Sequence, residues 1–111
     1  MRAVPTNADL KVERALELFN ASDYPRTVGG VARSLGAPAV CARPAPDRPS
    51  VVTIAVVWEL SWYRYEVDLS DEAGGPQRVG QGAEVSDLDP EELVANAVAD
   101  ERGQLQLVET A

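Results

Sequence analysis

The sequence predicts a single α+β domain over residues 1–111, with two N-terminal helices, a mostly antiparallel sheet of three or four strands, and a C-terminal helix packed on that sheet. Three patterns support this prediction. Apolar residues recur at helical spacing early in the chain, they alternate along residues 51–69, and a helix start signal follows at residue 89. We therefore expect the helical part at about 8–36, the sheet at about 50–86 and the last helix at about 89–102.

The first helix is predicted over residues 8–20, where Thr6 or Asn7 can cap its start. Its apolar residues fall on one face, and the charged residues between them take the other side. The apolar face is formed by Val12, Ala15, Leu16 and Phe19.

The second helix is predicted from Thr27 to Leu35, and Gly36 is placed to end it with a positive φ angle. The pair Gly29-Gly30 weakens this helix by about 1 kcal/mol per glycine relative to alanine. The helix therefore depends on tertiary packing, or it lets another backbone come close at the glycines.

Residues 51–69 carry the strongest β signal of the chain. One face of this segment is formed by Val52, Ile54, Val56, Trp58, Leu60 and Trp62. The phase then shifts by one residue, and the apolar series continues as Tyr63, Tyr65, Val67 and Leu69. A β-bulge in a long strand produces such a slip, and so does a tight hairpin near residues 59–61. Because no Gly, Asn or Asp occupies those three positions, we expect one long, bulged strand.

The remaining segments follow from turn and capping signals. Residues 71–76 form a turn, and residues 77–85 should return antiparallel, with Gly80 and Gly82 indicating a bulge or an edge position. Asp89, Pro90 and Glu92 are placed as the cap, the first residue and the capping-box partner of the last helix. Residues 37–50 are expected to be mostly loop, with a short strand or one helical turn at 39–43. Residues 105–107 are either a last strand or a frayed tail.

The composition excludes several kinds of chemistry. The chain has no histidine and one cysteine, Cys41, so it holds neither a histidine-activated nucleophile nor an intrachain disulfide. We therefore expect a protein that is not an enzyme and has no catalytic residues, metal site or cofactor. Because no apolar run reaches the ~18 residues of a membrane span, and because the first seven residues do not form a signal peptide, we expect a cytoplasmic protein without a membrane partner.

The net charge of −8 is unevenly distributed along the chain. Residues 24–48 carry four arginines and one aspartate, whereas residues 49–111 carry three basic and thirteen acidic residues. An acidic chain is repelled by phosphate backbones and by anionic membranes. Nucleic acid is therefore not expected as a partner, although one local basic surface is possible.

Residues 16–43 resemble the first two helices of a winged helix-turn-helix domain. The resemblance rests on the stretch 25–28, Pro-Arg-Thr-Val, and on 32–36, Ala-Arg-Ser-Leu-Gly, which is similar to the end of the helix before the recognition helix. It implies contacts to nucleic acid by Arg26, Arg33 and Arg43. The chain departs from the pattern at residues 38–43, where the recognition helix would be short and nearly without polar residues for base edges. A degenerate winged-helix regulatory or nucleic-acid-binding domain is therefore the alternative interpretation.

Both tryptophans and two of the three tyrosines fall within residues 58–65. Tryptophan and tyrosine are favoured interface anchors because they bury a large area and keep a polar group. The competing interpretation is that Trp58 and Trp62 fill the core. We expect Trp62, Tyr63 and Tyr65 to form the surface of a non-enzymatic interaction module that binds a protein partner or forms a homodimer. A small-molecule pocket under the curved sheet is a third possibility.

Overall fold

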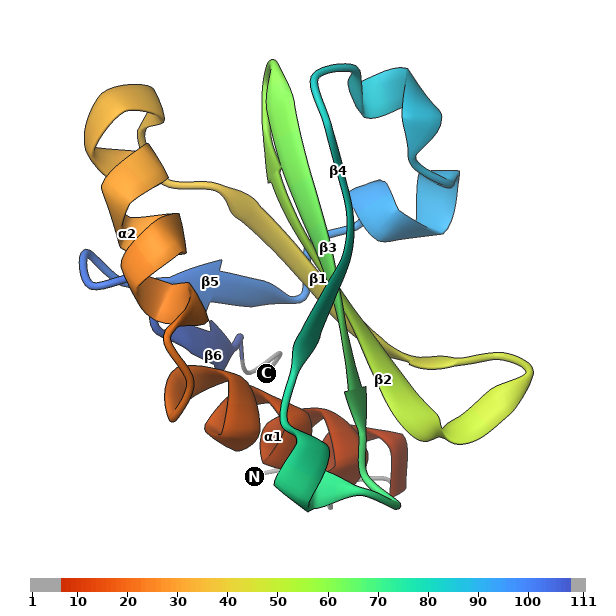
Figure 1. Ribbon diagram of the computed structural model, residues 1–111. Helices are drawn as coiled ribbons and strands as arrows, with labels where there is room; N and C mark the ends of the chain where they lie inside the picture. The colour runs from red at the N-terminus through yellow and green to blue at the C-terminus, as the bar shows by residue number, and fades with distance from the viewer. Residues whose placement is uncertain (1–6, 109–111) are drawn as a thin grey trace, which may run out of the picture.

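A computed structural model describes residues 7–108, which form two helices and a six-stranded sheet (Figure 1). The expected cap at Thr6 and the segment compared with a signal peptide lie at least partly outside the described residues. The helices are α1 (Asn7–Asn20) and α2 (Tyr24–Leu35). The strands are β1 (Ala39–Ala45), β2 (Arg48–Trp58), β3 (Ser61–Asp68), β4 (Gln77–Gly82), β5 (Ala97–Ala99) and β6 (Leu105–Leu107). Residues 7–108 also contain three 3-10 turns: η1 (Glu72–Gly74), η2 (Val85–Asp87) and η3 (Pro90–Leu93).

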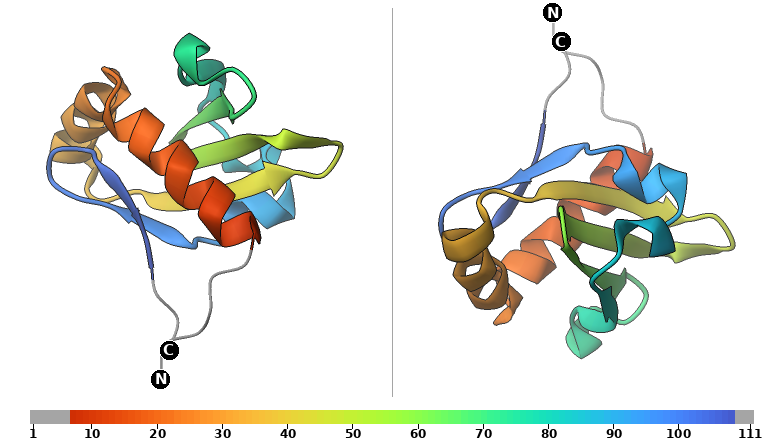
Figure 2. Two further views of the ribbon diagram at one scale, coloured as in Figure 1. Left: turned by 90° about the horizontal axis from the view of Figure 1, so that it is seen from below. Right: turned by 90° about the horizontal axis from the view of Figure 1, so that it is seen from above.

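The sheet has the order β4-β3-β2-β1-β5-β6, and every neighbouring pair is antiparallel. The sheet is strongly twisted, so that β2, β3 and β4 stand upright in Figure 1 whereas β5 lies across them. Helix α1 crosses one face of the sheet, as both views of Figure 2 show. The prediction of three or four strands is wrong, because the sheet begins at residue 39 and takes in the C-terminal residues to 107.

The two N-terminal helices are confirmed. Helix α1 buries all four residues of its predicted apolar face. Helix α2 begins at Tyr24, three residues before the expected start, and Gly36 has a φ of +86° at its end. A Cβ atom on Gly29 would lie 3.0 Å from the backbone carbon of Arg102, so this glycine lets the β5–β6 turn pack against the helix. No helix among residues 7–108 has the length and apolar character needed to cross a membrane.

Residues 51–69 form a hairpin and not the expected single bulged strand. Strand β3 pairs over its whole length with residues 51–58 of β2, with Trp58 opposite Ser61 at the closed end. The turn at Glu59 and Leu60 is exposed and contains no residue with a positive φ. Glycine and asparagine favour tight turns because they tolerate a positive φ. This turn has none, so it forms without either residue.

The predicted C-terminal helix at 89–102 is absent. A single 3-10 turn follows Asp89, and the chain then enters the sheet as β5 and β6. The capping contact forms, since the Asp89 N–H donates to Glu92 Oε1 at 3.1 Å. Beyond it, Asn96 pairs through its side-chain amide with both backbone groups of Ala42, at 2.8 Å each. The side of β1 that β2 leaves unpaired thus binds residues 96–97, which belong to a segment whose local signals favour a helix.

Of the two possibilities left open at residues 39–43, the structure has the strand, β1, which extends to Ala45 and replaces part of the expected loop and the recognition helix of the winged-helix resemblance. Strand β1 lies inside the sheet between β2 and β5, and it pairs with β2 from Ala39 to Ala45. The two N-terminal helices are therefore followed by a strand. The third helix of a helix-turn-helix is absent, because Val40 and Ala42 are buried under α1 as strand residues.

The core lies mainly between α1 and the sheet. Residues of β2 on this side alternate along the strand, and Trp58 is among them, with its Nε1 donating to the Gly36 carbonyl at 2.8 Å. A smaller cluster on the opposite face consists of Cys41, Ala55, Val57, Trp62 and Leu88. Trp58 and Trp62 thus lie on opposite faces, because the turn between them reverses the chain.

Tyr65 is the largest fully buried side chain. Its ring makes contacts with Phe19 and Tyr24, at centroid distances of 5.0 and 4.7 Å. Its hydroxyl is buried and has no hydrogen-bond partner among the described residues. Burial raises the pKa of Tyr65 to about 12, while the positive charge of Arg78 acts in the opposite direction.

Tyr65→Phe should raise the free energy of unfolding by about 1 kcal/mol at pH 7, because it removes a buried hydroxyl without a partner. The advantage should grow above pH 10. The wild-type tyrosine ionises at its ordinary value of 10.0 when unfolded and at about 12 when folded, so its contribution is complete below pH 10 and is lost as the pH rises through 12. Urea unfolding of both proteins at pH 7 and pH 10.5 measures this, and a destabilised variant would show that the hydroxyl is bonded.

Trp58→Ala should lower the free energy of unfolding by about 3–5 kcal/mol, as large aromatic truncations in protein cores do. The variant loses the packing against Tyr63 and the hydrogen bond to Gly36. Urea denaturation followed by far-UV circular dichroism gives the difference. A loss below about 1 kcal/mol would contradict the burial of this side chain.

Candidate functional site

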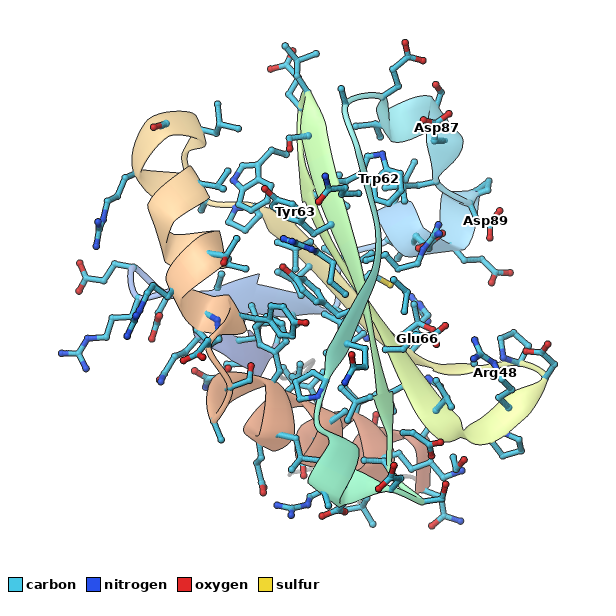
Figure 3. The ribbon with its side chains drawn as sticks, in the orientation of Figure 1. Arg48, Trp62, Tyr63, Glu66, Asp87 and Asp89 are labelled. Atoms are coloured by element: carbon cyan, nitrogen blue, oxygen red, sulfur yellow. The ribbon has the colours of Figure 1, made fainter. Side chains whose placement is uncertain are left out.

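The three aromatic residues expected to form a partner surface are mostly covered by the protein itself. Tyr65 lies in the core under α1, and Trp62 is 6 % exposed on the opposite face. Tyr63 is half-buried and packs edge-to-face on Trp58, with centroids 6.0 Å apart. Figure 3 shows Trp62 and Tyr63 on opposite sides of β3. These side chains therefore leave little apolar surface of their own for a partner.

All three aromatic residues lie directly across from the edge strand β4. Trp62 pairs with Gly82, Tyr63 with Gln81 and Tyr65 with Arg78. The Arg78 guanidinium also sits over the Tyr63 ring, 5.4 Å from its centroid. Strand β4 therefore packs beside the aromatic cluster formed by Trp62, Tyr63 and Tyr65.

Trp62 fixes the position of β4 most directly. Its ring lies against Gly80 and Gly82, and its Nε1 donates to the Glu84 carbonyl at 2.9 Å. A Cβ atom on Gly82 would lie only 2.8 Å from three atoms of this ring. The glycines that predicted a bulge or an edge therefore have a packing reason, since no side chain fits between β4 and the indole.

Strand β4 is one open edge of the sheet. No strand pairs with its outer side, and among the described residues only Tyr24 reaches its backbone, where its hydroxyl accepts from the Arg78 N–H at 3.2 Å. The pairing with β3 is irregular beside Val79, which is 48 % exposed, and is regular again from Gly80 to Gly82. The stretch 79–82 thus presents backbone groups that a further strand can bind.

The other edge of the sheet is occupied at Leu105, the first residue of β6. Asn20, at the end of α1, accepts from the Leu105 N–H at 2.8 Å and donates to the Leu105 carbonyl at 2.9 Å. Its side-chain amide thus takes the place that a neighbouring peptide group would occupy beside β6. The two edges differ in this respect, and β4 is the accessible one.

A groove of about 280 Å³ opens on the sheet face away from α1, between the β1–β2 turn and η3. Its floor has short side chains, among them Cys41, Thr53 and Ala55. Two ion pairs stand on its rim. Arg64 holds Glu92 at 2.7 and 2.8 Å, which lowers the pKa of Glu92, and Arg48 holds Glu66 at 3.0 Å.

The arginines expected to contact nucleic acid do not gather on one surface. Arg26 and Arg33 are exposed on α2. Arg43 belongs to β1 and lines the groove on the face away from α1, where its Nε contacts Cys41 Sγ at 3.2 Å. The positive segment 24–48 is therefore divided between a helix and the far side of the sheet.

Two residues that sequence reasoning missed are Asn20 and Asn96. Each asparagine uses its amide as a substitute peptide group for a strand far away in sequence. The partner of Asn20 is 85 residues distant, and that of Asn96 is 54 residues distant. No local signal marks these positions, because each function exists only once the sheet has formed.

Comparisons with protein-family models, with curated proteins and with solved structures find no match to this chain. Within residues 7–108, no group of three or more histidine, cysteine or carboxylate side chains is placed to hold a metal ion.

Gly82→Ala should destabilise the protein by about 1–3 kcal/mol, because the added methyl group must displace the rigid Trp62 ring and stretch its hydrogen bond. Gly30→Ala is the matched control, since a Cβ there meets nothing within 4 Å and alanine favours the helix. Thermal and urea unfolding of both variants should change in opposite directions. Equal effects would mean that Trp62 does not hold β4 in place.

Proposed function

We propose that this chain is a non-enzymatic interaction module that binds an extended segment of a partner protein along β4. In this mode the added segment forms backbone hydrogen bonds with an exposed sheet edge, and side-chain contacts provide the selectivity. The observation that carries the proposal is the difference between the two edges. At the β6 edge Asn20 binds both backbone groups of Leu105, while among the described residues no side chain forms a hydrogen bond with the backbone of residues 79–82.

Two further features support this function. The Trp62 ring packs against β4 and hydrogen-bonds to the chain just after it, so the strand is already held in place before a partner binds. Preorganisation of this kind reduces the entropy cost of binding. The irregular pairing beside Val79 also limits the registers that an incoming strand can take, which favours specific pairing over aggregation.

The other interpretations have less support. A winged-helix role lacks its recognition helix, because β1 occupies that segment, and its three arginines are spread over two sides of the molecule. A small-molecule role in the groove is weakened by the ion pairs of Arg48 and Arg64 on the rim, which already use their charges. The cytoplasmic location stays a prediction from the sequence.

Photo-crosslinking tests the proposal directly. p-Benzoylphenylalanine in place of Val79 should give a discrete crosslinked species when the chain is expressed in its native cell, and the same probe in place of Leu10 should not. Both positions are exposed apolar residues, but Leu10 lies on α1, away from the edge. Equal crosslinking from both positions, or none from position 79, would show that β4 is not the binding edge.

A further inference from the structure

We infer that the partner segment at β4 is an extended peptide with basic residues at both ends and an uncharged centre. This inference rests on the proposed function, since it names the chemistry of the segment that the edge accepts. It is based on the charges around β4, because the residues at the two ends of the strand are acidic, whereas the strand itself carries no acidic residue.

Strand β4 carries one charge, Arg78, whereas unpaired acidic residues stand at both of its ends. Asp71 precedes the strand beside η1, and Glu84 and Asp87 follow it at η2. Figure 1 shows η1 and η2 at the two ends of β4, and Figure 3 marks Asp87 at one of them. None of these three carboxylates forms an ion pair with a described residue, whereas the nearby Glu72 is held by Arg14 at 2.6 Å.

The spacing of the charges sets the length of the segment. Six residues of a strand span roughly 20 Å, so a partner strand of similar length runs along β4 from the end beside η1 to the end beside η2. The central residues of the partner lie beside Val79, Gly80 and Gln81, where no acidic side chain is available to bind a basic residue. The favoured segment therefore has its basic residues at the ends.

A second copy of this chain fits the edge less well. A two-fold dimer through β4 pairs the strand antiparallel with its own copy, so that Asp71 of one chain lies near Glu84 and Asp87 of the other. These like charges repel at both ends of the interface. The net charge of −8 adds to this repulsion, so a homodimer at this edge needs high salt, whereas a basic segment binds best at low salt.

The test uses four capped, fluorescein-labelled decapeptides and the full chain. The first has two lysines at each end of an alternating threonine–valine centre. The second has glutamines in place of the lysines, the third has glutamates, and the fourth keeps the lysines but has two prolines in the centre. Fluorescence anisotropy at 20 mM and 300 mM NaCl gives the affinities, and amide hydrogen exchange gives the protection of residues 79–82.

The lysine peptide should bind at least about tenfold more tightly than the glutamine peptide at 20 mM NaCl, and the difference should shrink at 300 mM. It should also protect the amides of residues 79–82. The triple variant Asp71→Asn, Glu84→Gln, Asp87→Asn should lose about that tenfold preference. The control variant Glu13→Gln, Asp47→Asn, Glu101→Gln removes the same charge elsewhere on the exposed surface and should keep it.

The outcomes separate the two proposals. Equal binding of the lysine and glutamine peptides, with protected amides, would overturn the basic-segment inference and leave strand addition at β4 standing. Equal binding of the lysine peptide and its proline form, without protection of residues 79–82, would overturn strand addition itself. Absence of binding by all four peptides, together with a chain dimer in sedimentation equilibrium at 300 mM NaCl, would assign the edge to a second copy and overturn the inference.

Discussion

The structure depends on the tight turn at Glu59 and Leu60. This turn reverses the chain between two apolar strands and sets the register of β3 on β2, which decides the side of the sheet that each residue of β3 faces. Trp62 joins the small cluster on the open face, while Tyr63 and Tyr65 join the core under α1. Three of the five β3 residues that pair with β4 are these aromatic residues, so the packing of β4 depends on the face that each of them takes.

The two edges of the sheet are treated differently. At β6 the side-chain amide of Asn20 bonds the outer backbone groups of Leu105. In the same way, the side-chain amide of Asn96, just before β5, bonds the backbone of β1. Both asparagines satisfy backbone groups that would otherwise be left without partners beside α1 or inside the sheet. At β4 aromatic side chains of β3 pack against the strand and the register is irregular, but among the described residues no side chain forms a hydrogen bond with the backbone of residues 79–82. An edge that is held rigid yet uncovered is the arrangement expected of a strand-binding site.

Electrostatics distinguishes the possible occupants of that edge. The chain is acidic overall, but its acids are not spread evenly around β4: they lie at the ends of the strand, and the strand between them carries only Arg78. Several other carboxylates are already used internally, since Glu66, Glu72 and Glu92 each hold an arginine. These ion pairs leave the net charge of −8 unchanged, because each joins one carboxylate to one arginine. The carboxylates of Asp71, Glu84 and Asp87, which form no ion pair with a described residue, lie where an extended segment at β4 would end.

The sequence by itself determined the local elements whose apolar pattern is independent of distant contacts. These are the two helices, the buried face of α1, the β character of residues 51–69 and the edge position of the glycine-containing strand. Only the tertiary structure decided whether residues 51–69 turn back at Glu59 and whether the segment after Pro90 is a helix or a strand. Whether residues 51–69 turn back at Glu59 depends on the strands with which each half of the resulting hairpin can pair. Whether the segment after Pro90 is a helix or a strand depends on the side of β1 that β2 leaves unpaired. Asn96 can bond the backbone groups on that side only after β1 has formed. The candidate site follows the same division, because the sequence indicated the aromatic residues, whereas their burial beneath an open edge is a property of the assembled sheet.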